Sequence, residues 1–62
     1  MPTSGKEMVK ELQRDGWKVG RIEGSHYIME KGSRTLAVPV HANRDLKQGT
    51  EARIRKLTGL EK

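Results

Sequence analysis

The sequence predicts an α+β fold in which a three-stranded antiparallel sheet carries two helices packed on one face. Its 62 residues open with a segment of helical spacing, continue with three short strand-like runs, and close with a second helical segment. The short connections between the strand-like runs favour antiparallel pairing, and two helices on one side of a small sheet form a two-layer domain. We expect residues 1–62 to form a single domain.

The first helix is predicted to begin near Gly5. Ser4 and Glu7 have the spacing of a capping box, in which each side chain bonds the backbone N–H of the other residue. Gly16 suits the left-handed residue that follows a helix, and Trp17 can fold back onto the last turn. Three apolar residues share one arc and are predicted to face the core: Met8, Val9 and Leu12. Two columns of opposite charge are predicted to pair along a solvated outer face: Lys6, Lys10 and Arg14 beside Glu7, Glu11 and Asp15.

Three strands are predicted in the middle of the chain. Alternation in the first strand slips at Gly20, where we expect a bulge or a bend. Because Pro39 has no N–H to donate, it is expected at an edge strand or at a strand end. The predicted strands are residues 17–23, 26–31 and 34–40, separated by the turns Gly24-Ser25 and Gly32-Ser33. The predicted inward residues of the third strand are Leu36, Val38 and Val40.

The second helix is predicted to start at Gly49-Thr50, after a polar loop over residues 41–48 held by Leu46. Thr50 is the expected N-cap, because its hydroxyl can accept a bond from the first free N–H groups. Gly59 is expected to end the helix. The predicted inward residues are Ile54 and Leu57, and the predicted outward residues are Arg53, Arg55 and Lys56.

The charge of the chain points to a polyanionic partner. Thirteen basic residues against eight acidic ones give a net charge of +5 and a pI near 10.0, which favours nucleic acid over other partners. Without cysteine the chain has neither a disulfide framework nor a thiolate zinc site. No apolar run is long enough for a membrane span and no signal peptide opens the chain, so we expect a cytoplasmic protein with no membrane partner. A core this small favours a binding partner or self-association.

The feature that points to chemistry is Gly24-Ser25-His26, a histidine just after a turn between two strands. Catalytic groups often lie on connections steadied by a rigid scaffold, and histidine exchanges protons near neutral pH. From this pattern alone, a lone strand histidine is more often structural. A zinc site built from His26, His41 and Asp45 matches no standard ligand spacing. We therefore expect neither a metal nor a cofactor.

Three segments carry a resemblance to a known family. They are Gly24-Ser25-His26 after Gly16-Trp17, Val38-Pro39-Val40-His41 leading into residues 45–50, and the closing residues 54–60. Together, over about residues 4–60, they resemble the HicA toxin family, the RNA-cleaving half of bacterial and archaeal HicA–HicB toxin–antitoxin pairs. One departure is Ala42-Asn43, where that family often has a glycine.

The resemblance implies a double-stranded-RNA-binding-like fold and a metal-independent endoribonuclease that cuts mRNA to stop translation. It implies that His26 is the catalytic histidine and that a HicB-like antitoxin binds the toxin and blocks its site. We expect mRNA and that antitoxin as partners, and either a homodimer or a hetero-oligomer with the antitoxin.

The chemistry of RNA fits one histidine in proton transfer. His26 can act as the base that deprotonates the 2′-hydroxyl, or as the acid that protonates the leaving 5′-oxygen, but not as both in one concerted step. Gly24 and Ser25 would let a phosphate approach the backbone closely. The candidates for the second role, or for stabilising charge on phosphorus, are His41, Tyr27, Arg21 and Lys47. Two alternatives stay open: a non-catalytic double-stranded-RNA-binding module, and a basic protein that meets an acidic protein partner.

Overall fold

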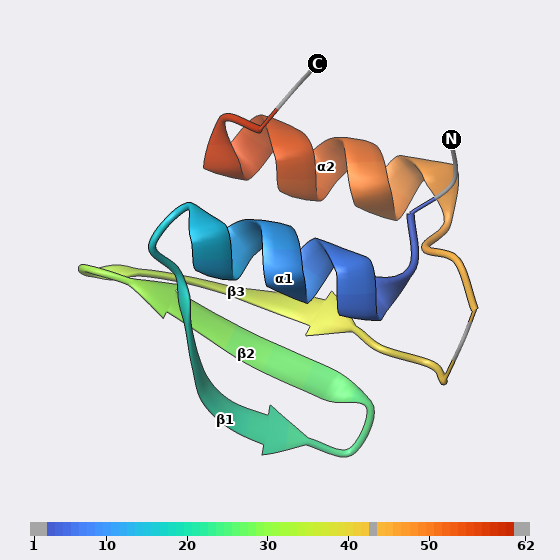
Figure 1. Ribbon diagram of the computed structural model, residues 1–62, viewed down its shortest axis with the longest axis horizontal. Coiled ribbons are helices and arrows are strands. Elements are labelled where there is room, and N and C mark those ends of the chain that lie inside the picture. The colour runs from blue at the N-terminus through green and yellow to red at the C-terminus, as the bar shows by residue number, and fades with distance from the viewer. Residues whose placement is uncertain (1–2, 43, 61–62) are drawn as a thin grey trace.

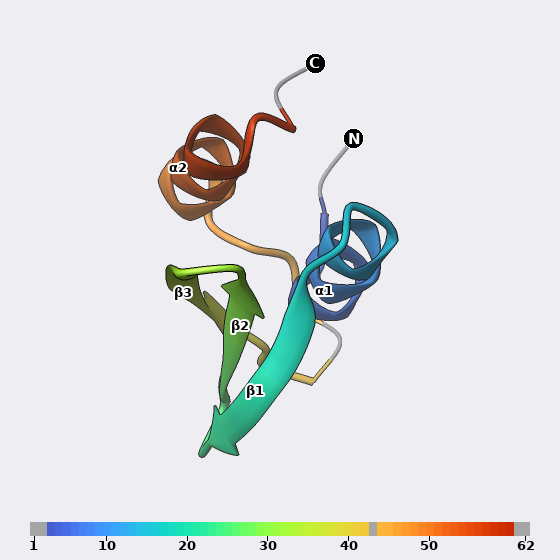
Figure 2. The same ribbon diagram turned by 90° about the vertical axis from the view of Figure 1, so that its left-hand side faces the viewer.

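The computed structural model describes residues 3–42 and 44–60, and it has the element order α-β-β-β-α. The elements are α1 (Gly5–Arg14), β1 (Lys18–Glu23), β2 (His26–Lys31), β3 (Arg34–Pro39) and α2 (Gln48–Thr58). The strands form one antiparallel sheet in the order β1-β2-β3, and both helices lie on the same side of it (Figure 1, Figure 2). The predicted α+β fold is thereby confirmed.

Helix α1 begins as the sequence predicts. The Ser4 hydroxyl accepts a bond from the Glu7 N–H, and the Glu7 carboxylate accepts one from the Ser4 N–H, both at 3.2 Å. At the other end Gly16 has φ of 99°, and the Trp17 N–H donates to the Leu12 carbonyl at 2.9 Å. The left-handed glycine therefore turns the chain so that Trp17 packs back under the helix.

The sheet has the predicted bulge. Val19 pairs with Met29 and Arg21 with Ile28, which leaves Gly20 as the extra residue in β1. Pro39 is the last residue of β3, an edge strand, so its missing N–H breaks no ladder within the sheet.

Alternation along β2 decides which face each side chain takes. Met29 is fully buried and points toward the helices, as does its cross-strand partner Leu36. Even-numbered β2 residues therefore face away from the helices. These are His26, Ile28 and Glu30, opposite Pro39, Ala37 and Thr35.

The core lies between α1 and the sheet. Eight hydrophobic residues are buried there: Met8, Val9, Leu12, Trp17, Met29, Val38, Val40 and Ile54. Helix α2 contributes only Ile54 to this set. The Arg34 guanidinium stands 5.8 Å from the centre of the Trp17 ring, close enough for a cation–π contact. Of the helices that the structure describes, neither is long and apolar enough to cross a membrane.

Helix α2 differs from the prediction at its start and in its rotation. It begins at Gln48 with Lys47 as N-cap and no side-chain capping bond, so the prediction of Thr50 as N-cap was wrong. Leu57, predicted inward, is 49% exposed, whereas Arg55, predicted outward, is 9% exposed. The flank of α2 that meets α1 carries Arg55, which bonds the Glu11 carboxylate of α1, and this orientation leaves Leu57 exposed.

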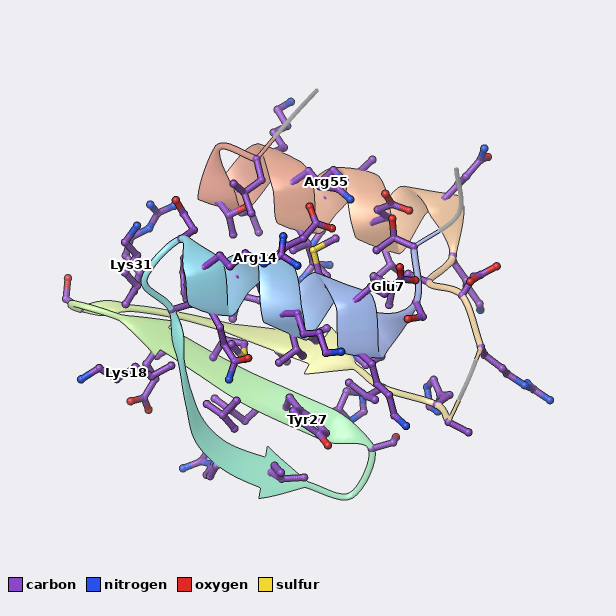
Figure 3. The ribbon with its side chains drawn as sticks, viewed as in Figure 1. Glu7, Arg14, Lys18, Tyr27, Lys31 and Arg55 are labelled. Atoms are coloured by element: carbon purple, nitrogen blue, oxygen red, sulfur yellow. The ribbon has the colours of Figure 1, made fainter. Side chains whose placement is uncertain are left out.

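Arg55 is the centre of a polar network between the two helices (Figure 3). Its guanidinium donates two bonds to the carboxylate oxygens of Glu11, each at 3.1 Å, and a third to Glu51 at 2.9 Å. It also donates to the Thr3 hydroxyl at 3.2 Å. The expected place of Glu11 in a solvated charge column was therefore wrong, because its carboxylate joins α1 to α2.

The same network shifts the acid–base behaviour of its members. The bond from Arg55, with a further bond from the Thr3 hydroxyl, holds the pKa of the Glu51 carboxyl below its usual range, although burial acts in the opposite direction. Hydrogen bonds to Glu11 and then Glu51 raise the pKa of Arg55 above its already high ordinary value. The folded state thus favours the charged forms of Glu51 and Arg55.

Candidate functional site

The predicted catalytic histidine begins the central strand. His26 pairs with Glu23 of β1 and with Pro39 of β3, so both neighbouring strands fix its backbone. The Ser25 carbonyl, one residue earlier, accepts a bond from the Val40 N–H at 2.6 Å and ties the turn to the end of β3. The sequence thus places a titratable ring on a rigid sheet end, beside a turn.

The His26 side chain is exposed and lies on the sheet face away from the helices. Gly24 has φ of 58°, a left-handed conformation that favours glycine, and open space surrounds the position where a Cβ would be. The imidazole and the turn before it can therefore be reached by a substrate as large as an RNA strand.

A hollow of about 340 Å³ adjoins this end of the sheet. It is lined by Pro39, His41, Arg44, Asp45, Leu46, Lys47 and Thr50. In Figure 1 the end of β3 and the starts of both helices lie on the right-hand side of the molecule, with the β1–β2 turn below them and the start of α2 above. Pro39 lines the hollow and is also the cross-strand partner of His26, so this one residue connects the hollow to the histidine, which is not itself among the lining residues.

The loop that forms the hollow is fixed at both ends. The Arg44 N–H donates to the His41 carbonyl at 2.9 Å, and the Leu46 N–H donates to the Thr3 carbonyl at 2.8 Å. Asp45 forms an isolated antiparallel bridge with Ser4. Ala42 has φ of 50°, a conformation that glycine adopts more easily, at the position where the HicA-like pattern often has glycine. Asn43, the other half of that departure, lies outside the described residues.

The candidate supporting residues are distributed unequally around His26. His41 and Lys47 both line the hollow. Arg21 lies on the other neighbouring strand, where its guanidinium pairs with Glu23 at 2.5 Å in an exposed ion pair. Tyr27 is half-buried, packs against the core and points to the opposite face of β2, so the structure does not bring it beside His26 (Figure 3).

Two charged residues of the hollow were not among the predicted site residues. Arg44 and Asp45 lie in the loop predicted as a polar connection, and Asp45 was considered only as part of a zinc site. Neither Arg44 nor Lys47 forms an ion pair with another residue that the structure describes. The signal in the sequence was the spacing of Arg44 and Lys47, two cations three residues apart just after the strand that ends beside His26.

The arrangement can exchange protons and bind an anion. Within residues 3–42 and 44–60, no three histidine, cysteine, aspartate or glutamate side chains are close enough to hold a metal ion. The groups gathered at this end are imidazole rings, a guanidinium, an ammonium and one carboxylate.

A comparison with protein-family models matches residues 5–60 to a family described as the HicA toxin of bacterial toxin–antitoxin systems. The matched range contains the Gly24-Ser25-His26 turn and every residue that lines the hollow. Searches of curated proteins and of solved structures gave no significant match.

Proposed function

Because the chain belongs to the HicA toxin family, whose members pair with an antitoxin, we propose that it is a metal-independent endoribonuclease that cuts mRNA and so inhibits translation. The observation that carries the proposal is His26, an exposed imidazole fixed at the end of a sheet, next to an open glycine–serine turn. A histidine that only stabilised the fold would be expected to bury its ring and bond the interior.

The proposed reaction uses the nucleophile that RNA carries. The 2′-oxygen forms a bond to phosphorus as the bond from phosphorus to the 5′-oxygen breaks, and one proton leaves the 2′-hydroxyl while another reaches the 5′-oxygen. His26 performs one of these two transfers, worth about 10²–10⁴-fold in rate. His41 and Lys47 are the better candidates for the other transfer or for stabilising charge on phosphorus, since both line the adjoining hollow while Tyr27 points away.

Inhibition by a partner follows from the same geometry. A HicB-like antitoxin that covered the sheet end would block access to His26, since the ring lies open to solvent there. We propose that the toxin and its antitoxin form an inhibited hetero-oligomer in the cytoplasm. A homodimer of the free toxin is the other assembly that the small hydrophobic core of the chain would favour.

A second candidate function is a non-catalytic double-stranded-RNA-binding module. The net charge of +5 and the α-β-β-β-α order favour it, since such modules grip about 16 base pairs by shape and phosphate contacts. The two functions differ in their need for His26, because a domain that recognises only the shape and phosphates of a duplex does not require an exposed imidazole beside a turn.

Induced expression in cells tests the proposal. The wild-type chain should arrest growth and fragment mRNA, co-expression of a HicB-like antitoxin should restore growth, and the purified protein should cut single-stranded RNA in the presence of EDTA. His26→Ala should remove the growth arrest and the mRNA fragmentation and slow the cleavage of purified RNA about 10²–10⁴-fold, whereas Arg53→Gln, on the exposed side of α2, should change none of these. Intact RNA combined with tight binding of a 16-base-pair duplex would instead support the non-catalytic module.

A further inference from the structure

We propose that the hollow between the end of β3 and the start of α2 binds one unpaired nucleotide next to the scissile phosphate. Arg44 and Lys47 bind the phosphate of that nucleotide, and Asp45 accepts a hydrogen bond from its ribose or base. The inference rests on the proposed nuclease function and gives that function a substrate subsite, which would make single-stranded RNA the preferred substrate.

The position of the hollow follows from the sheet register. His26 and Pro39 are direct partners in neighbouring antiparallel strands, so their Cα atoms are about 4.5–5.5 Å apart and their side chains share a face. Pro39 in turn lines the hollow. An RNA strand whose scissile phosphate lies beside His26 can pass over Pro39 at the edge of the sheet and place the next nucleotide in the hollow.

The charges in the hollow fit a phosphate. Arg44 and Lys47 are exposed, and no carboxylate among the described residues pairs with either, so both are available to a ligand. A guanidinium can hold two phosphate oxygens at once, and an ammonium adds a compact charge. By contrast, Arg21, the other cation near His26, is already paired with Glu23.

The rest of the lining fits a ribose and a base. Pro39 and Leu46 are half-buried and give an apolar surface, and His41 supplies a ring on which an unstacked base can lie. Asp45 is unfavourable next to a phosphate but can accept a bond from a 2′-hydroxyl or a base amino group.

The size of the hollow limits what it can hold. About 340 Å³ is at the low end of the roughly 300–1,000 Å³ typical of small-molecule sites. Bases inside an A-form duplex are stacked and paired, whereas those of single strands can be splayed out into such a space. One unpaired nucleotide therefore fits where a duplex does not.

The test measures RNA binding in the full chain carrying His26→Ala, so that cleavage does not interfere. The probe is a fluorescein-labelled single-stranded RNA of eight nucleotides, compared with the same RNA in a duplex. Arg44→Gln/Lys47→Gln is compared with Arg53→Gln/Lys56→Gln, which removes the same charge from exposed positions on α2. Unfolding followed by Trp17 fluorescence verifies that each variant is folded.

The proposal predicts that the Arg44/Lys47 variant binds the single strand at least tenfold more weakly than the control variant. The slope of log K against log salt should fall by about 0.7, since both side chains neutralise the same phosphate and each neutralised phosphate on a single strand contributes about 0.7. Equal losses in the two double variants, or equal binding of duplex and single strand by the parent protein, would overturn it. These outcomes are independent of catalysis, whereas failure of the wild-type protein to cut RNA would refute the nuclease function itself.

Discussion

Replacement of Arg55 by methionine tests the account of how α2 is held. Methionine keeps the unbranched apolar stem but removes the guanidinium and with it every donor. Arg55 donates five hydrogen bonds through its side chain, to two carboxylates, one hydroxyl and the Leu60 carbonyl. The substitution therefore leaves the carboxylates of Glu11 and Glu51 facing each other with no cation between them.

The expected loss of unfolding free energy is about 3 kcal/mol. Removing one partner of a buried ion pair typically costs about 3–5 kcal/mol. The side chains of Glu11 and Glu51 keep 26% and 20% of their exposure, so water lowers the penalty toward the bottom of that range. A chain of 62 residues has a total stability of roughly 3–9 kcal/mol, so this one change removes a large share of it.

Urea unfolding followed by fluorescence of Trp17, the one tryptophan, measures the effect. With a slope of about 1 kcal/mol per molar urea, the midpoint should fall by about 3 M. Arg53→Met, an exposed arginine on the same helix, serves as the matched control and should stay within about 0.5 kcal/mol of the parent.

A triple variant separates lost charge balance from lost packing. Adding Glu11→Gln and Glu51→Gln to Arg55→Met removes the two negative charges that Arg55 balanced and should recover more than half of the loss. A loss below 1 kcal/mol for Arg55→Met, or no recovery in the triple variant, would refute the argument that this network joins the helices.

Three further predictions concern stability. Because the pKa of Glu51 is lowered in the folded state, its charged form stabilises the fold above the unfolded-state pKa of about 4.3, and this contribution is lost as pH falls through the lower folded-state pKa. Urea midpoints between pH 7 and pH 2 should show this loss in the parent protein. The loss should be smaller in Arg55→Met. Gly5→Ala should lower the unfolding free energy by about 2 kcal/mol in urea titrations, because its Cβ would collide with the Pro39 carbonyl; an unchanged midpoint would contradict that close approach. Ala42→Gly should raise the unfolding free energy by about 0.5 kcal/mol and the melting temperature in calorimetry by about 2–4 °C. Ala42 has a left-handed backbone, and relief of about 1–2 kcal/mol of strain there exceeds the conformational entropy that glycine loses on folding. A lower melting temperature would be evidence against strain at this residue.

The parts of the fold that sequence alone predicts are those set by neighbouring residues. The capping box of Ser4 and Glu7, the bulge at Gly20 and the position of Pro39 at a strand end each depend on local chemistry, and all are confirmed. The rotation of α2 depends on a carboxylate 44 positions away, at Glu11, which no local pattern contains. An arginine among other cations on a helix is usually solvated, so the prediction for Arg55 followed the usual case.

The candidate site also has a part that local sequence predicted and a part that it did not. The histidine was identified from the short motif around it, and the turn and the two flanking strands were predicted from the sequence, whereas the register that fixes His26 opposite Glu23 and Pro39 was not. The hollow was not, because it exists only where the end of β3, the loop through Arg44 and Asp45, and the start of α2 come together. Residues in a polar loop carry no sign of what they line until the elements on both sides are placed.

The single-turnover rate of RNA cleavage by the wild-type protein and by His26→Ala tests the central claim most directly, measured in EDTA with the protein in excess over the RNA and above the dissociation constant of the complex. We predict that the variant binds RNA as the wild type does and cuts it about 10²–10⁴-fold more slowly. Cleavage at an unchanged rate by a folded His26→Ala protein would show that proton transfer in this molecule does not depend on that imidazole.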